Sequence, residues 1–148
     1  MGLFFKKAPV EDDRMEALIQ EYTNYRRRTS QELDAAHKKA ARETTLPFLA
    51  LYDDLARALD APCSDENYRK GIELIFKNLM ATFASVQIFP MDSKGKIFNP
   101  AFHEAVRQIS DPTLRAEEIA EVVQVGFLMD DEVIRHAKVV VANCDGKE

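Results

Sequence analysis

The chain has 148 residues and a mass of 16.8 kDa; 46% of its residues are hydrophobic, 30% are charged, and the formal net charge is −5. This size suits one domain, or a small domain on a long helix, and the apolar content excludes disorder along the whole chain. Five Gly and six Pro provide few turns for an all-β chain, so a helix-rich fold is expected. The acidic balance argues against a dedicated nucleic-acid-binding protein, which usually presents a basic face.

The sequence shows no membrane-spanning run and no signal-peptide pattern, so a cytoplasmic protein without a membrane partner is expected. Cys63 and Cys144 have no partner at metal-ligand spacing, which indicates reduced thiols and no metal site. Residues 1–12 are expected to be a disordered N-terminus, and residues 144–148 a tail.

Residues 13–60 have the composition of a long helix, with no Gly and a single Pro. The residues on one face of this helix are spaced three and four apart in an eleven-residue repeat. Because this period nearly matches that of a straight α-helix, two such helices can run side by side. A helix of this length measures roughly 70 Å, and a monomer of this size could not bury it. We therefore predict a homodimer. Its predicted seam consists of Tyr22, Tyr25, Thr29, Leu33, Ala36, Ala40, Leu51 and Leu55.

Pro47 divides this seam into two parts, and a kink or break is expected there because proline lacks a backbone N–H. The seam before Pro47 is made of Tyr, Thr and Ala side chains with one Leu, which bury little apolar area. We predict that the paired helices loosen there on heating before the rest unfolds, as a thermosensor would. Tyr22 and Tyr25 could alternatively be a stacking platform, and residues 26–28, all Arg, could bind phosphates, but seam and solvated-surface roles are favoured.

A second helix is predicted from an N-cap at Ser64 or Asp65 to about Ala84. It would form an antiparallel hairpin with the preceding helix, and two hairpins from two chains would give a four-helix bundle. Residues 13–85 are thus expected to be the dimerisation stalk and bundle. Gly71 lies inside this helix at a cost of about 1 kcal/mol relative to Ala, which indicates a close packing partner or simple tolerance.

Residues 86–143 are predicted to form a small β-domain, which makes the fold class α+β. The β-branched and aromatic runs are 86–89, 96–98, 102–109, 120–128 and 133–142, and a final hairpin is expected to turn at 129–132. His103 and Glu104 would point to opposite faces of a strand, and Ser93 and Ser110 lack a nearby His and Asp arrangement. The sequence therefore predicts no enzyme, no cofactor and no metal.

Short motifs occur in a fixed order over residues 15–143. In the helical part they are Asn24–Thr29, Leu46-Pro47, Asp54–Leu59 and Gly71–Leu74. In the β-region they are Phe98–Val106, Gly126-Phe127, Val133–Arg135 and Ala137–Ala142. Each motif is modest alone, but their order and spacing together resemble the GrpE family, the nucleotide exchange factors of DnaK-type chaperones.

The resemblance implies a co-chaperone that does no bond chemistry. It implies a parallel homodimer with long paired helices, a four-helix bundle and one β-domain per protomer. One β-domain would bind the ATPase domain of the chaperone and open its nucleotide cleft, which accelerates ADP release. By motif position, the chaperone-binding residues are Arg26, Arg57, Phe98, Val123 and Val141. The structural residues implied are Gly71, Pro47, Pro100, His103 and Gly126.

Some positions depart from the family's pattern. Glu132 follows Asp130 and Asp131 where an Asn-Gly-Arg turn is usual, and Lys138 stands where the family often has Met. Two other functions stay open on the sequence alone. The alternative is a structural coiled-coil adaptor whose β-domain binds another protein, and a third hypothesis is a nucleic-acid binder that uses the arginine run.

Overall fold

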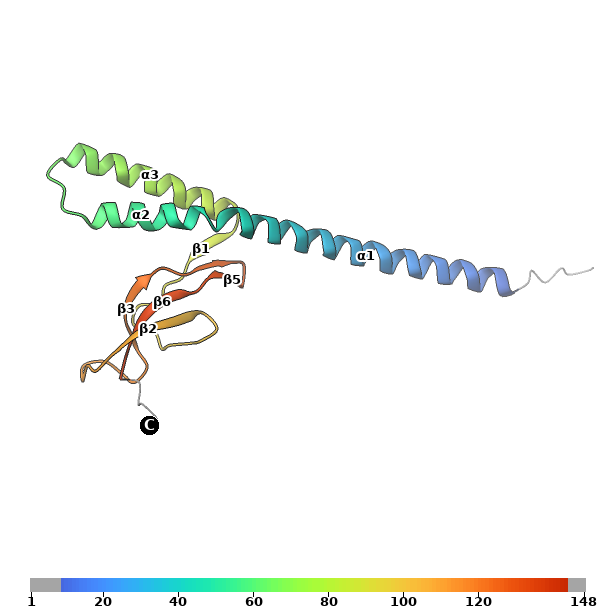
Figure 1. Cartoon of the computed structure of the whole chain (residues 1–148). Coiled ribbons are helices and arrows are strands. Elements are labelled where there is room, and N and C mark those ends of the chain that lie inside the picture. The colour runs from blue at the N-terminus through green and yellow to red at the C-terminus, as the bar shows by residue number, and fades with distance from the viewer. Residues whose placement is uncertain (1–8, 144–148) are drawn as a thin grey trace, which may run out of the picture. The chain divides into compact units, whose positions relative to one another are not determined.

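The computed structural model describes residues 9–143, in which three helices precede six short strands (Figure 1). The helices are α1 (Pro9–Thr45), α2 (Phe48–Asp60) and α3 (Glu66–Ser85). The strands are β1 (Ile88–Pro90), β2 (His103–Ile109), β3 (Ile119–Gln124), β4 (Phe127–Met129), β5 (Glu132–Arg135) and β6 (Ala137–Ala142). The predicted α+β class, with a long first helix and a C-terminal β-domain, is confirmed.

The described helix starts earlier than predicted, because residues 9–12, expected to be disordered, belong to α1. Cys144, the rest of the expected tail and residues 1–8 lie outside the described residues. Residues up to Ala40 form one unit, and the residues from Ala41 onward form a second that holds α2, α3 and all strands. Within residues 9–143, no helix combines the length and the apolar content that crossing a bilayer requires.

The predicted break at Pro47 is confirmed. α1 ends at Thr45, and α2 begins at Phe48 after a turn at Leu46 and Pro47. Pro47 keeps right-handed helical angles, φ −63° and ψ −31°, so the chain turns without leaving the helical region. Its ring has no N–H to donate to the preceding turn, and the backbone N–H of Leu49 donates instead to the carbonyl of Leu46 at 3.2 Å.

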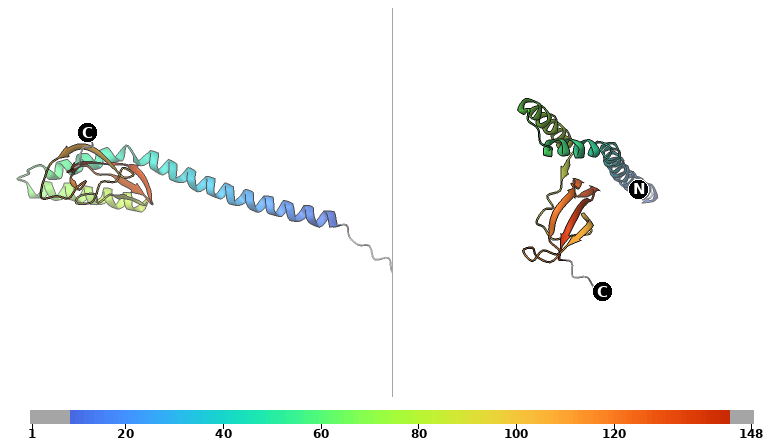
Figure 2. Two further views of the ribbon diagram at one scale, coloured as in Figure 1. Left: turned by 90° about the horizontal axis from the view of Figure 1, so that it is seen from below. Right: turned by 60° about the vertical axis from the view of Figure 1, so that its left-hand side comes forward.

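α2 and α3 form the predicted hairpin (Figures 1 and 2). Asp65 is the N-cap of α3, and its carboxylate accepts hydrogen bonds from the backbone N–H groups of Asn67 and Tyr68 at 2.9 and 3.1 Å. These two bonds satisfy donors that the first helical turn leaves without a partner. The side chains of Tyr52 and Phe76 join the two helices, with ring centroids 5.1 Å apart.

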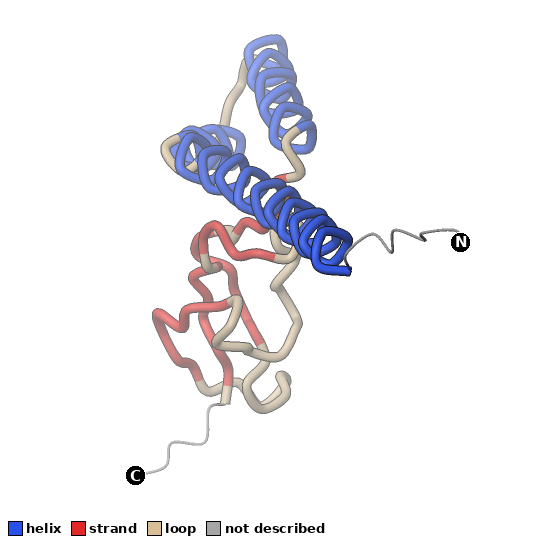
Figure 3. The backbone as a smooth tube through the Cα atoms, turned by 90° about the vertical axis from the view of Figure 1, so that its right-hand side faces the viewer, coloured by secondary structure: helices blue, strands red, loops and turns tan. Residues whose placement is uncertain are grey.

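The strands form two small sheets, seen as red segments in Figure 3. The first has the order β1-β4-β5, with antiparallel neighbours throughout. The second has the order β2-β6-β3, in which β6 pairs in parallel with β2 and antiparallel with β3. The hairpin expected at 129–132 is confirmed as β4-β5, with Met129 opposite Glu132 and Asp130 at φ 52°.

Three strand predictions need correction. Residues 96–98 form only an isolated bridge, between Ile97 and Glu118. Residues 120–128 and 133–142 each split into two strands, around Gly126 and at His136, because the chain passes from one sheet to the other at both places. Register shifts in β3 change the face on which its residues lie, so Val123 is exposed while Ile119 is buried.

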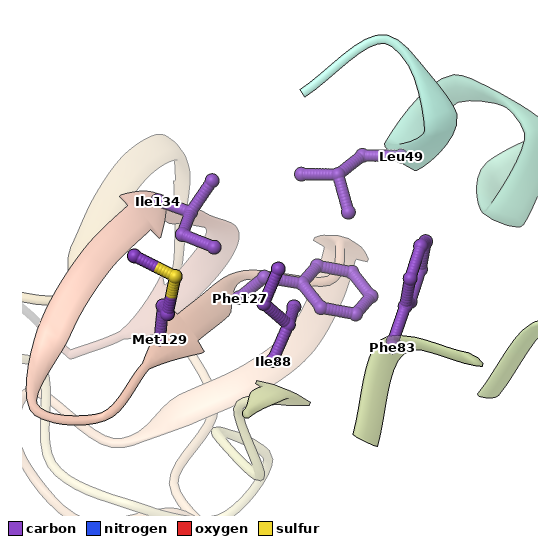
Figure 4. Packing of buried hydrophobic residues seen from close by; sticks show 6 residues of the cluster. All are labelled: Leu49, Phe83, Ile88, Phe127, Met129 and Ile134. Atoms are coloured by element: carbon purple, nitrogen blue, oxygen red, sulfur yellow. The ribbon is translucent and has the colours of Figure 1, made fainter. Parts of the chain in front are cut away.

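Two apolar clusters stabilise the second unit. One lies where the hairpin meets the first sheet and consists of Leu49, Phe83, Ile88, Phe127, Met129 and Ile134 (Figure 4). Phe127 packs edge-on against the rings of Tyr52 and Phe83, with centroids 4.9 and 5.7 Å away. The other cluster lies within the second sheet and consists of Ile119, Ala137, Val139 and Val141. The first cluster therefore packs the β-domain against α2 and α3.

Candidate functional site

Different faces of α2 have different partners, because residues three and four apart share a face of a helix. Leu49 and Tyr52 pack into the apolar cluster with Phe127. A second face carries Leu51, a predicted seam residue, which is exposed. The third face carries the polar row from Asp53 through Arg57 to Asp60, which lines a groove against the β-domain. The sequence of α2 thus provides a packing face, an unpaired apolar face and a charged face.

The groove has a volume of about 490 Å³ and lies between α2 and two strands of the second sheet. Its α2 wall consists of Tyr52, Asp53, Ala56, Arg57 and Asp60. Its other wall consists of Val122, Val123 and Gln124 of β3, Val125 just after it, and Lys138 of β6. The structure therefore brings together two of the five predicted chaperone-binding residues, Arg57 and Val123, beside Lys138, one of the positions that depart from the family's pattern.

Both predicted residues in the groove are accessible. Val123 is 57% exposed, whereas its two neighbours in β3 are half-buried. The guanidinium of Arg57 lies 3.1 Å from the Asp54 carboxylate on the same helix, with both side chains exposed. An exposed pair of this kind contributes little to stability, so Arg57 could exchange Asp54 for an acidic group of a partner at small cost.

At the inner end of the groove, Asp53 binds two side chains of the β-domain. Its carboxylate accepts two hydrogen bonds from the Arg135 guanidinium, both at 2.8 Å, and one from the Gln124 amide at 2.9 Å. Burial alone would raise the pKa of Asp53, but the hydrogen bonds from Arg135 and Gln124 outweigh it and hold that pKa below its usual value. Asp53 and Gln124 could not be predicted from the sequence, since no local pattern links positions 71 or 82 residues apart.

Two other predicted contact residues lie elsewhere. Val141 is fully buried, at 0% exposure, in the cluster of the second sheet, so the expectation that it faces a partner is wrong. Its position in the middle of three strands explains the burial, because β6 has β2 on one side and β3 on the other. Phe98 is half-buried against the same cluster, with its ring centroid 6.1 Å from that of His103. Phe98 therefore supports the β-domain and does not line the groove.

α1 carries the last predicted contact, Arg26, whose guanidinium lies 6.0 Å from the centre of the Tyr22 ring. The predicted seam residues of α1 are exposed in the single chain, and Tyr22 is 59% exposed. Three further apolar side chains that the sequence analysis did not include, Met15, Leu18 and Ile19, are also exposed. The pairing of two chains along this face stays a prediction, and the apolar face available for it is larger than expected.

The predicted structural residues have different surroundings. A Cβ at Gly126 would lie 2.6 Å from the backbone N of Ala137 and 2.9 Å from the carbonyl of Arg135, so only glycine fits there. Pro100 lies in a turn in which the Asn99 carbonyl accepts hydrogen bonds from the N–H groups of Phe102 and His103. At Gly71, in contrast, no described residue outside the adjacent part of α3 lies within 4 Å of an added Cβ. The chain's own β-domain therefore does not explain Gly71, and close packing there would need a second copy.

His103 has the buried serine neighbour that the sequence analysis did not foresee. Its Nε2 lies 3.1 Å from the hydroxyl of Ser93, which is 1% exposed. Its Nδ1 accepts a hydrogen bond from the backbone N–H of Asn99 at 3.0 Å, so in the neutral ring the proton is on Nε2 and is donated to Ser93. A catalytic histidine needs the opposite arrangement, with a free Nε2 that takes the serine proton. The pair is structural. Among residues 11–143, no three His, Cys, Asp or Glu side chains are placed to hold a metal ion.

Comparison with known proteins agrees with the order of the motifs. The GrpE family model matches residues 4–143. Protein GrpE of Clostridium beijerinckii is 38% identical over 131 residues, which cover 88% of this chain and 63% of that protein. Protein GrpE of Clostridium acetobutylicum is 36% identical over 88% of this chain and 65% of its own length. Protein GrpE of Prosthecochloris aestuarii is 33% identical over 82% of this chain and 63% of its own length. The chain thus spans somewhat less than two thirds of these relatives, and it belongs to the GrpE family.

Proposed function

We propose that this protein is a nucleotide exchange factor for a DnaK-type chaperone. Membership of the GrpE family supports the class of partner. The single structural observation that carries the proposal is the groove between α2 and β3, because it places Arg57 and Val123, two positions implied by the family motifs, on facing walls. An exposed apolar residue beside an exposed cationic side chain is a suitable contact for a protein surface that carries acidic groups.

The exchange itself requires no bond chemistry from this chain. The factor binds the open conformation of the ATPase domain more tightly than the closed one, which holds ADP. By linkage, the factor weakens ADP binding by the same ratio by which ADP weakens binding of the factor. The role of this chain is to present a rigid surface that fits the open state, and a homodimer through the exposed face of α1 would carry that surface.

The direct test is the rate at which fluorescent ADP leaves the chaperone of the same organism, measured by stopped flow. We expect the rate to rise with the concentration of this protein and to reach a plateau. The variant Val123→Asp should move the curve to higher concentration, while Lys70→Ala, on the exposed surface of α3, should leave it in place. No acceleration at saturating protein would exclude an exchange factor and favour the adaptor function.

A further inference from the structure

The contact between α2 and the β-domain has an apolar part and a directional polar part. The apolar part, around Phe127, excludes water. It allows a range of angles between α2 and the β-domain, since apolar burial is not directional. The polar part is the cluster of Asp53, Gln124 and Arg135, which we name the Asp53 clamp. Each of its hydrogen bonds has a defined donor and acceptor geometry.

Arg135 uses all three nitrogen atoms of its guanidinium in this clamp. Nη1 and Nη2 donate to the two oxygens of Asp53, each at 2.8 Å. Nε and Nη2 also donate to the carbonyl of Val125, at 3.1 and 2.7 Å. One planar fork thus joins a side chain of α2 to the backbone just after β3, and a lysine could not replace it because its ammonium is a single point of charge.

The clamp lies directly beside both of the accessible residues in the groove. Asp53 is one helical turn from Arg57 on the same face of α2. Gln124 follows Val123 at the end of β3. Any rotation of the β-domain against α2 would therefore break the clamp and separate Arg57 from Val123. Both charged side chains of the clamp are about one fifth exposed, at 17% and 21%, so water weakens this contact less than it weakens a surface pair.

We propose that the Asp53 clamp holds α2 and β3 at a fixed angle, so that Arg57 and Val123 meet the chaperone as one preformed surface. Arg135, Asp53 and Gln124 act in this proposal as positioning residues, although Asp53 and Gln124 also line the groove. The inference rests on the proposed function for its consequence, but the fixed angle is a property of this chain alone. Loss of the clamp would lower the fraction of molecules competent to bind, and the apparent affinity falls by that fraction.

The angle can be measured without the chaperone. Spin labels are attached to Cys63, exposed in the α2–α3 loop, and to a cysteine introduced by Lys94→Cys, with Cys144→Ser to avoid a third label. Labelled chains are diluted into unlabelled ones so that only distances within one chain are recorded. Arg135→Lys and Asp53→Asn should each broaden the distance distribution about twofold. The matched control is Arg115→Lys, which alters an ion pair with Glu118 inside the β-domain and should leave the distribution unchanged.

The same variants are then titrated in the ADP-release assay, well below their unfolding temperatures. For Arg135→Lys and Asp53→Asn we expect the protein concentration that gives half-maximal acceleration to rise about fivefold. The plateau rate should stay the same, because the bound chaperone imposes the angle between α2 and β3. A residue that only stabilised the fold would lower the unfolding temperature and leave this concentration unchanged. Unchanged distances in both variants would overturn the clamp. If the wild type fails to release ADP, the proposed function fails, and the distances still decide whether the clamp fixes the angle.

Discussion

At the scale of single residues, His103 has its tautomer set by the backbone. The N–H of Asn99 donates to Nδ1, so protonation of that nitrogen would remove the hydrogen bond and place a charge inside the β-domain. Burial lowers the pKa of His103, and the nearby charges of Lys96 and His136 lower it further. Its neighbour Glu104 is exposed.

The lowered pKa predicts how stability depends on pH. Above the unfolded-state pKa of about 6.5 both states are neutral, and the contribution of His103 is fully present. As the pH falls below that value the unfolded state takes up the proton first, so the free energy of unfolding decreases until the folded-state pKa is reached. Urea unfolding of the wild type at pH 7.5 and 5.5 should show this loss. It should shrink in His103→Gln and persist in His37→Gln, which changes an exposed residue of α1. An equal loss in His103→Gln and the wild type would contradict the assignment.

Two glycines provide a second prediction at this scale. Gly126→Ala should destabilise the β-domain by about 1–3 kcal/mol, because the added methyl group meets backbone atoms of Arg135 and Ala137 that cannot move freely. Gly71→Ala, in open space inside α3, should instead stabilise by up to about 1 kcal/mol through helix propensity. Thermal unfolding of both variants checks the pair. A destabilised Gly71→Ala would show that a second chain packs against α3 at this point.

At the scale of elements, the helices were predictable and the strand ends were not. The lack of Gly, the position of Pro47 and the carboxylate of Asp65 are local signals, and all three act as expected in the structure. The breaks at Gly126 and His136 depend on which strands lie alongside, which a run of β-branched residues does not encode. The burial of Val141 has the same cause, since β6 becomes a central strand only when β2 returns in parallel beside it.

The weak composition of α1 predicts its order of unfolding. Thr29, Ala36 and Ala40 are exposed in the single chain and bury little area if two chains pair. We expect amide hydrogen exchange of α1 to rise reversibly at a temperature at which β6, with five of its six residues buried, is still protected. Thr29→Leu should raise the temperature of the α1 transition, whereas Ser30→Leu, one position off the seam, should not. A single transition shared by α1 and β6 would contradict this order.

At the scale of the whole molecule, the candidate site is assembled from residues far apart in the sequence. The motifs identified Arg57 and Val123 separately, but the groove that joins them depends on the angle between α2 and β3. That angle in turn depends on Asp53 and Arg135, 82 residues apart, and no periodicity or motif spacing connects the two. The sequence could therefore predict the family, while the geometry of the groove required the structure.

The groove predicts energetic coupling between its walls. Arg57→Ala and Val123→Asp should each weaken binding to the chaperone's ATPase domain by about tenfold, or roughly 1.4 kcal/mol, without lowering the unfolding temperature. If both residues contact one partner surface, as we propose, the double variant should deviate from the sum of the two effects by at least about 0.5 kcal/mol. Isothermal titration calorimetry of the four proteins measures this. Strictly additive effects would place the two residues in separate contacts.

The central claim is that this protein promotes exchange by binding the nucleotide-free chaperone more tightly than the ADP-bound one. The measurement that tests it most directly is the affinity for the isolated ATPase domain, determined with and without saturating ADP. Linkage predicts that ADP weakens binding by the same factor by which this protein weakens ADP binding. Equal affinities in the two states would contradict the claim, since a partner that binds both states equally shifts neither.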